Sequence, residues 1–136
     1  MNDDLYQKAL VELARAAVPV ATLPNATHRA VRDNPLCGDR VGVAARLDDG
    51  KAVALSFDTR GCLICLAATT VAARKSPGWS AQDAENTLQA MRAWLKGGGM
   101  PYPELEAFKP VLPRKSRHDC VILPFEALRD LFQSSK

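Results

Sequence analysis

Two runs of alternating apolar residues on either side of a tight-turn sequence constrain this chain most. The turn is Asp48-Asp49-Gly50, and the apolar positions are Val41, Val43, Ala45 and Leu47 before it and Val53, Leu55 and Phe57 after it. Alternation with period two places every second side chain on one face of a strand, and an Asp-Gly pair favours a hairpin turn. We therefore expect an antiparallel hairpin with one buried face, and a third strand over residues 27–32.

Four further segments have the apolar spacing of helices. They cover residues 3–17, 62–73, 80–95 and 121–132. Asn2 or Asp3 can cap the first helix, Cys62 lies near the start of the second, and Ser80 with Asp83 resembles a capping box for the third. The buried stripe of the third helix is expected at Ala84, Leu88, Met91 and Leu95. A proline-rich connector over residues 100–113 leads to the last helix.

The order of these elements favours an α+β fold in which helices pack on one side of a small antiparallel sheet of about three strands. The chain has 136 residues and shows no internal repeat and no low-complexity tract, so we expect one domain over residues 1–136. Hydrophobic residues make up 47% and charged residues 24% of the chain, a composition typical of soluble globular domains.

Charge and hydropathy exclude several classes of protein. Lys and Arg number 18 against 15 Asp and Glu, and a net charge of +3 is too small for a dedicated nucleic-acid surface. The N-terminus is acidic, unlike a secretion signal, and no apolar stretch approaches the ~20 residues of a membrane span. We therefore expect a cytoplasmic protein that binds neither nucleic acid nor membrane. In that reducing compartment, cysteines are expected as thiols, metal ligands or redox groups rather than disulfides.

Cys37, Cys62 and Cys120 each lie where a turn is expected to meet a helix or strand. Because a hairpin brings its two ends together, Cys37 and Cys62 can converge, and Asp39 can point into the same place. Three thiolates and one carboxylate suit tetrahedral Zn²⁺, while the richness in thiolates also suits an iron–sulfur cluster. The residues alone leave both metals open.

Three sequence segments, NPLCGDR, GCLICLAATT and RHDCVILPFEAL, resemble in order the three cysteine motifs of the IscU/NifU N-terminal family of iron–sulfur cluster assembly scaffolds. The long spacing between Cys62 and Cys120 resembles the SufU subtype. IscU-type members carry His immediately before the third cysteine, where this chain has Asp119, and Arg117 matches the Arg of the SufU pattern. The resemblance implies a SufE/NifU-like fold and favours the zinc-bound, sulfur-transferring subtype.

The resemblance also implies roles for individual residues. Cys37, Asp39, Cys62 and Cys120 correspond to the metal ligands, and Cys37 to the thiol that accepts persulfide sulfur from a cysteine desulfurase. Arg117 would steady the thiolates. The implied cofactor is zinc, or an iron–sulfur cluster or iron held transiently, and downstream cluster acceptors would be further partners. The alternatives are a [2Fe–2S] scaffold at the same ligands, a structural zinc module for protein interaction, and a dithiol oxidoreductase.

Two residues beside these motifs have competing interpretations. Cys65 stands where the family usually has Ser or Ala, and is either a small buried apolar residue or the second thiol of a Cys62-x-x-Cys65 pair. We expect it on the far side of the helix start, or next to the ligands without binding the metal. His118 lies between charged neighbours and is expected at the surface or beside the site rather than as a ligand.

Overall fold

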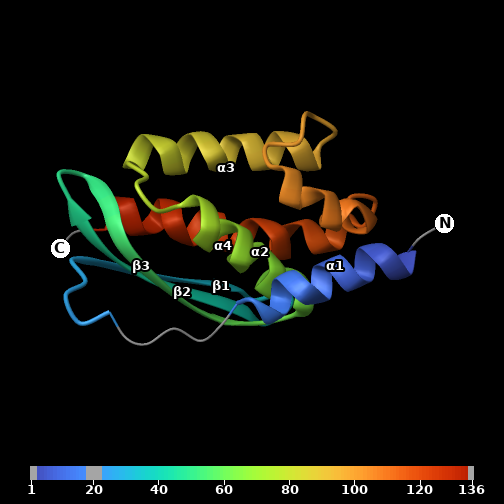
Figure 1. The fold of residues 1–136 in the computed structure, drawn as a ribbon, viewed down its shortest axis with the longest axis horizontal. Helices are drawn as coiled ribbons and strands as arrows, with labels where there is room; N and C mark the ends of the chain where they lie inside the picture. Colours follow the sequence, from blue (N-terminus) through green and yellow to red (C-terminus); the bar gives the residue numbers. More distant parts are fainter. Residues whose placement is uncertain (1–2, 18–22, 135–136) are drawn as a thin grey trace.

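The computed structural model describes residues 3–17 and 23–134, which form a three-stranded sheet covered by helices (Figure 1). The elements in chain order are α1 (Asp3–Arg15), β1 (His28–Asn34), β2 (Asp39–Asp48), β3 (Lys51–Arg60), α2 (Leu63–Lys75), α3 (Ala81–Leu95), the 3-10 helices η1 (Pro103–Val111) and η2 (Lys115–Arg117), and α4 (His118–Gln133).

The sheet has the order β1-β2-β3, and both pairs of strands are antiparallel. Asp49 and Gly50 both adopt positive φ, of 55° and 77°, in the turn between β2 and β3. Two positive φ values are the geometry whose twist matches a tight hairpin. The predicted hairpin is therefore confirmed, and the third strand lies slightly beyond the predicted residues 27–32.

A β-bulge in β3 changes the face that Val53 occupies. Leu47 pairs with Ala52 and Arg46 pairs with Ala54, so Val53 has no partner in the register. Val53 is 49% exposed, whereas Ala52 is fully buried. The expectation that Val53 belongs to the buried face was wrong, because the extra residue of a bulge interrupts the alternation of the strand.

The helices lie on one face of the sheet, as predicted (Figure 1). Helix α4 packs on β1 and β2, α2 packs on β3, and α1 and α3 form contacts with α2 and α4 respectively. The largest fully buried side chains come from η1, α3 and α4 and include Phe108, Phe125, Leu88, Met91 and Leu105. The core therefore lies between the sheet and the helices and continues under α3 and η1.

Several helix boundaries differ from the predicted ones. Helix α4 begins at His118 because the 3-10 turn η2 leads directly into it, so Cys120 lies within its first turn rather than before it. The predicted connector over residues 100–113 contains η1. The capping box of Ser80 and Asp83 is confirmed. Trp94 is buried in α3, and the predicted Leu95 is only partly buried. Asn2 lies outside the described residues.

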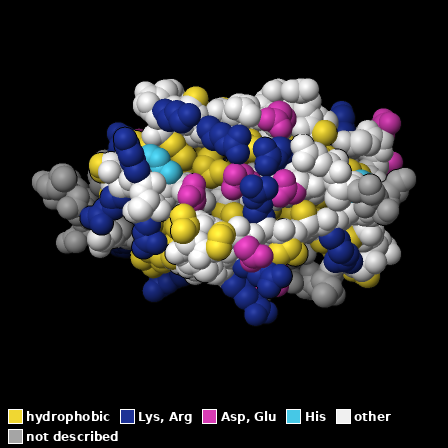
Figure 2. All heavy atoms as spheres, turned by 180° about the vertical axis from the view of Figure 1, so that it is seen from behind, with side chains coloured by type: hydrophobic (Ala, Val, Ile, Leu, Met, Phe, Trp, Pro, Cys, Tyr) yellow, Lys and Arg dark blue, Asp and Glu magenta, His cyan; other side chains and the backbone are white. Residues whose placement is uncertain are grey.

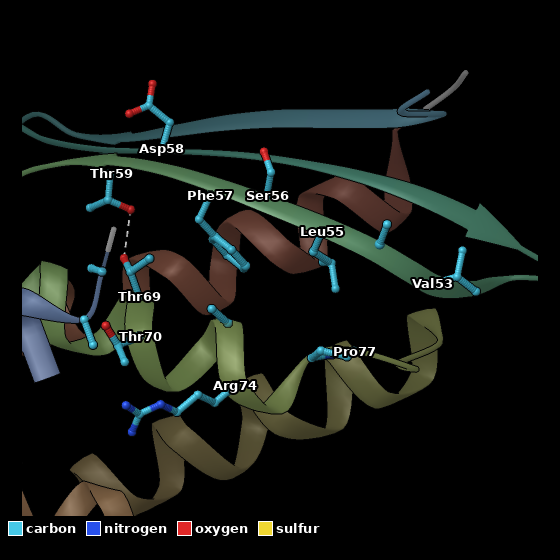
Figure 3. A pocket seen from close by; sticks show the side chains of 14 residues that line it. Val53, Leu55, Ser56, Phe57, Asp58, Thr59, Thr69, Thr70, Arg74 and Pro77 are labelled. Carbon is cyan, nitrogen blue, oxygen red and sulfur yellow. Dashed lines mark hydrogen bonds between the residues drawn. The ribbon is translucent and has the colours of Figure 1, made fainter. Parts of the chain in front are cut away.

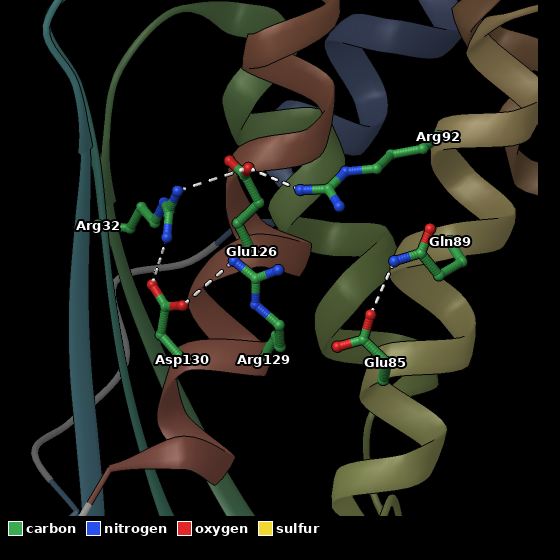
Figure 4. Close-up of polar contacts among 7 residues, drawn as sticks. All are labelled: Arg32, Glu85, Gln89, Arg92, Glu126, Arg129 and Asp130. Carbon is green, nitrogen blue, oxygen red and sulfur yellow. Dashed lines mark hydrogen bonds and ion pairs between the residues drawn. The ribbon is translucent and has the colours of Figure 1, made fainter.

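An ionic network fixes α4 against β1 and α3 (Figure 4). The Glu126 carboxylate of α4 lies 3.6 Å from the Arg32 guanidinium of β1 and 3.2 Å from the Arg92 guanidinium of α3. Arg32 also contacts Asp130, one helical turn further along α4, at 2.9 Å. The network holds in place the helix whose first turn carries Cys120.

Basic side chains are interspersed with acidic ones across the middle of the rear face of the molecule (Figure 2). This mixture agrees with the small net charge of the chain. Within the described residues, no helix combines the length and the apolar character needed to cross a membrane.

Candidate metal centre

The ends of three structural units converge where the predicted site residues lie. Cys37 belongs to the turn between β1 and β2, and Asp39 begins β2. Cys62 is the N-cap of α2, directly after β3, and Cys120 lies in the first turn of α4. Because Arg40 pairs with Arg60 in the sheet, the start of β2 is beside the end of β3, which brings Asp39 next to Cys62.

The turn that carries Cys37 is built on Asn34. The carbonyl oxygen of Asn34 accepts hydrogen bonds from the amides of Cys37 at 3.3 Å and Gly38 at 2.8 Å, and its side-chain oxygen accepts one from the amide of Leu36 at 3.1 Å. Gly38 adopts a φ of +77°, which glycine reaches without steric cost. The turn leaves Cys37 exposed to solvent.

The Asp39 carboxylate is the buried centre of the site, with the residue only 2% exposed. One of its oxygens, Oδ1, accepts a hydrogen bond from the amide of Cys62 at 2.9 Å, and the other, Oδ2, lies 3.6 Å from the Cys62 thiol. The carboxylate is packed against Gly61, where an added Cβ would lie 2.5 Å from Oδ1. Only a residue without a side chain at position 61 leaves this space to Asp39.

The thiols of Cys37 and Cys120 lie 3.6 Å apart. The donor atoms of Cys37, Asp39 and Cys120 all lie within 4.8 Å of one another, a spacing that could hold a metal ion. Cys62 is outside this trio but contacts its carboxylate. The structure therefore brings together all four predicted ligands, and three sulfurs with one oxygen are donors that suit tetrahedral zinc.

Burial and hydrogen bonding have opposite effects on the pKa of the Asp39 carboxyl. Burial opposes ionisation of Asp39, but hydrogen bonds from the Cys37 thiol, the Cys62 amide and the Cys120 thiol outweigh it and lower the pKa of the carboxyl. For Cys120, burial raises the pKa of the thiol, and contact with the Asp39 carboxylate raises it further. A bound divalent cation would instead keep the Cys120 thiol deprotonated, because a thiol that coordinates a metal loses its proton.

Cys65 lies beside this cluster and is fully buried. Its backbone amide donates to the thiol of Cys62 at 3.5 Å, which is the hydrogen bond that an N-cap side chain accepts from the amide three residues further on. Burial raises the pKa of the Cys65 thiol, and the negative charge of Asp39 adds to the effect. Cys65 is thus next to the predicted ligands rather than remote from them.

Arg117 and His118 flank the first turn of α4. Arg117 is half-buried at its N-cap and forms no ion pair with the acidic residues in the described part of the chain. The Nε2 atom of His118 lies 2.8 Å from the carbonyl oxygen of Leu112. This contact occupies one ring nitrogen and leaves Nδ1, and the group of donors that could hold an ion does not include His118. The expectation that His118 is not a ligand stays a prediction.

A groove of about 360 Å³ lies between β3 and α2, away from the predicted site residues (Figure 3). Phe57 points from β3 toward α2, and the hydroxyls of Thr59 and Thr69 are hydrogen-bonded at 2.8 Å across the groove. Thr70 donates to the carbonyl oxygen of Leu13 at 2.6 Å. These hydroxyls already have partners within the protein. No sequence pattern predicted this groove.

Sequence reasoning missed two features of the site. The first is the dependence of Asp39 on Gly61, for which the only signal was a glycine directly before Cys62. The second is the turn anchored by Asn34, whose signal was the Asn-Pro pair that begins the first cysteine motif.

Comparisons with known proteins give the family and the fold of this chain. The model of a family described as NifU-like N terminal domain matches residues 13–108, a span that contains Cys37, Asp39, Cys62 and Cys65 and ends before Cys120. A search of curated proteins found no match.

Two solved structures have the same fold. The N-terminal part of a nitrogen-fixing NifU-like protein from Brucella abortus is 27% identical with a TM-score of 0.87, and the alignment covers 96% of this chain and 94% of that one. A candidate iron–sulfur cluster assembly scaffold protein for the SUF system from the thermophile Fervidobacterium islandicum AW-1 is 21% identical with a TM-score of 0.83, covering 97% of this chain and 99% of that one. These likenesses confirm the predicted α+β fold.

Proposed function

The chain belongs to the family of NifU-like N-terminal domains, and on this premise we propose that it works in iron–sulfur cluster assembly by accepting sulfur from a cysteine desulfurase. In this proposal Cys37 is the acceptor, and Cys37, Asp39, Cys62 and Cys120 hold zinc. The observation that carries it is the convergence of Cys37, Asp39 and Cys120 within 4.8 Å. Its place would be the cytoplasm, with downstream cluster acceptors as further partners, in the manner of the SufU subtype.

The donor set of this chain fits zinc. Cys37 and Cys120 supply sulfurs 3.6 Å apart, and Asp39 supplies a carboxylate that the Cys62 amide orients. Bound zinc would keep the thiols deprotonated and so provide thiolate for reaction at neutral pH. Three thiolates and a carboxylate carry more negative charge than one divalent ion neutralises. Arg117, which has no ion pair among the described residues and lies three residues before Cys120, would compensate part of this charge.

The sulfur transfer would be a thiol–persulfide exchange. The Cys37 thiolate attacks the terminal sulfur of the desulfurase persulfide and forms a new sulfur–sulfur bond. The sulfur–sulfur bond of the desulfurase breaks, and its cysteine leaves as a thiolate. The terminal sulfur keeps its proton, so Cys37 ends as a persulfide and no external oxidant or reductant is consumed.

The position of Cys37 supports its role as the acceptor. Cys37 is exposed on a turn, whereas Cys120 is buried and Cys62 is half-buried at the ends of helices. Exposed apolar side chains flank two of the thiols: Leu36 is 89% exposed beside Cys37, and Leu63 is 41% exposed beside Cys62. In this proposal these two side chains contact the desulfurase when it docks.

The test is transfer from a cysteine desulfurase supplied with cysteine, followed by mass spectrometry of the acceptor. We expect one persulfide on Cys37 of the wild type and none on a Cys37→Ser variant. A Cys120→Ser variant is the matched control, since it loses a predicted ligand but keeps the acceptor. If the Cys37→Ser protein folds and gains persulfide elsewhere at the wild-type rate, Cys37 is not the acceptor.

A second candidate function is a scaffold on which a [2Fe–2S] cluster is built as cargo at the same donors. The observation that favours it is the presence of four thiols at one site, a softer set than a zinc module requires. Incubation with ferrous iron and sulfide would then produce the visible absorbance of a cluster. A protein inert toward both desulfurase and iron would instead be a structural zinc module.

A further inference from the structure

The outer edge of β3 runs along the groove between β3 and α2. The strand order β1-β2-β3 leaves β3 at the edge of the sheet, and residues 53–59 of this strand all line the groove. We propose that the groove binds an extended peptide segment of a partner protein, which adds a strand to β3 and places an acidic side chain against Arg74. This inference goes beyond the proposed function and uses neither the metal nor sulfur transfer.

The first support is the direction of the backbone groups of β3. The carbonyl oxygen of Ala45 in β2 accepts a hydrogen bond from the amide of Thr27 at 2.9 Å, so Ala45 directs its backbone polar groups toward β1. Leu55 pairs with Ala45 across the hairpin, and its own amide and carbonyl therefore point away from β2. Phe57 and Thr59, two and four residues further along β3, share that direction.

These outward backbone groups have no partner outside the sheet in the described part of the chain. The same edge is already paired at Ala52, whose amide donates to the carbonyl oxygen of Trp79 at 2.9 Å and whose carbonyl oxygen accepts from the amide of Gly78 at 2.8 Å. The edge thus forms strand-like hydrogen bonds at one end and leaves residues 55–59 unpaired. Unpaired backbone groups of an edge strand are a template for the addition of another strand.

The second support is the apolar space beside this edge. Phe57 points from β3 toward α2 (Figure 3), and Ala73 and Pro77 line the groove from the side of α2. The groove volume of about 360 Å³ is within the range of ligand-binding clefts. Every second side chain of an added strand would enter this space, and the others would lie on the opposite face of the sheet.

The third support is the charge at the groove. Arg74 lines the groove, is exposed, and forms no ion pair among the described residues. Its charge acts on Glu104 only at longer range. The carboxylate of Asp58, which also borders the groove, points away from α2 (Figure 3). A cation beside apolar groups favours a mainly apolar segment that carries one acidic side chain.

A second copy of this chain fits the groove less well. If two β3 edges paired, the side chains of one copy that face the helices of the other would be Leu55, Phe57 and Thr59. None of them supplies a carboxylate for Arg74. The charge of the groove therefore favours a segment of a different protein.

The experiment selects binders from a display library of random ten-residue peptides against the full chain, and fluorescence anisotropy measures the affinity of synthetic copies. We expect the selected peptides to share an acidic residue and an apolar residue two positions away. An Arg74→Glu variant should bind them at least about tenfold more weakly, because repulsion replaces attraction. Replacing the acidic residue of the peptide by Lys should restore binding to this variant.

Methylation of single peptide amides tests the addition of a strand and needs no variant of the protein. Only every second amide of an added strand donates to β3. We therefore expect methylation to weaken binding at least about fivefold at alternate positions, the equivalent of one hydrogen bond, and to have little effect between them. Equal effects at successive positions would overturn the proposed strand addition.

The matched control is Arg46→Glu, which makes the same change of charge at an exposed residue of β2 outside the groove. We expect it to bind the peptides like the wild type, whereas Ala73→Trp, which fills the groove from an exposed position, should abolish binding. A library that yields no binder, or binders weakened equally by Arg46→Glu and Arg74→Glu, would overturn the proposal. Self-association that Ala73→Trp abolishes would also overturn it, because the occupant would then be a second copy.

Discussion

The carboxylate of Asp39 occupies the space that a side chain at position 61 would need. A Cβ on Gly61 would lie 2.5 Å from Oδ1, 2.8 Å from Cγ and 3.1 Å from Cβ of Asp39. Gly61 also precedes the amide of Cys62 that binds this carboxylate at 2.9 Å. One glycine therefore permits both the burial of Asp39 and its contact with the start of α2.

We predict that Gly61→Ala displaces Asp39 and weakens the site. Filling an occupied space costs about 1–3 kcal/mol of folding free energy, and the displaced carboxylate would leave the Cys62 amide without its acceptor. Urea unfolding and the zinc content after chelator challenge measure the two effects. Gly99→Ala is the control, since an added Cβ there meets nothing within 4 Å. A Gly61→Ala protein with wild-type stability and zinc content would contradict the assigned packing.

A second prediction concerns Arg117, which has no acidic partner among the described residues and lies half-buried three residues before Cys120. If it compensates the negative charge of the loaded site, Arg117→Gln will weaken zinc binding roughly threefold at low salt, the size expected of a partly exposed charge interaction. The difference should shrink at high ionic strength. Competition with a zinc chelator at two salt concentrations measures it.

The control for this experiment is Arg114→Gln, which removes an exposed cation from the same segment. We expect it to leave zinc binding nearly unchanged. Equal losses in the two variants would show that Arg117 acts only through the general charge of the surface.

How far the sequence predicted the structure depends on whether a feature is local. The hairpin between β2 and β3 was predictable because Asp49 and Gly50 themselves favour positive φ. The exposure of Val53 was not, because the bulge forms where Ala52 exchanges hydrogen bonds with Gly78 and Trp79, far along the chain. Periodicity carries no information about such a partner.

The same distinction applies to the site. The hairpin argument placed Cys37, Asp39 and Cys62 together because the paired ends of strands must be neighbours. The position of Cys65 remained open between two interpretations, since the side of a helix that faces Asp39 depends on how α2 packs against the sheet. The start of α4 was also missed, because η2 adds a helical turn before Cys120 that has no apolar periodicity.

A third prediction concerns Glu126, whose carboxylate forms ion pairs with the guanidinium groups of both Arg32 and Arg92. Replacing Glu126 by Gln removes the charge that both cations share, so we expect a loss of about 1 kcal/mol in the free energy of unfolding. Urea denaturation measures the loss. The control is the same substitution made in an Arg92→Ala protein. There Glu126→Gln should lower the free energy of unfolding by less, because one of the two cations that pair with Glu126 is gone. Equal costs in both backgrounds would show that Arg92 contributes nothing to the network.

The last prediction is a pH dependence that comes from Glu104. Its carboxylate lies 2.9 Å from the ammonium group of Lys75, which also lies 5.0 Å from the centre of the Tyr102 ring. The hydrogen bond from Lys75 lowers the pKa of Glu104 below its ordinary value of 4.5. A carboxyl whose pKa is lower in the folded state stabilises the protein above the unfolded pKa, and this contribution disappears as the pH falls through the folded value.

We therefore expect Glu104→Gln to lower the free energy of unfolding by about 0.5–1 kcal/mol near pH 7, the range for a partly exposed ion pair. The difference from the wild type should shrink as the pH falls below the unfolded value of about 4.3 and vanish below the lower folded value, where both proteins carry a neutral group at this position. Urea denaturation near pH 7 and at an acidic pH below both values measures it. Glu85→Gln is the control, since the partner of Glu85 is the neutral amide of Gln89. A Glu104→Gln deficit of equal size at both pH values would assign the effect to packing and not to the charge of the pair with Lys75.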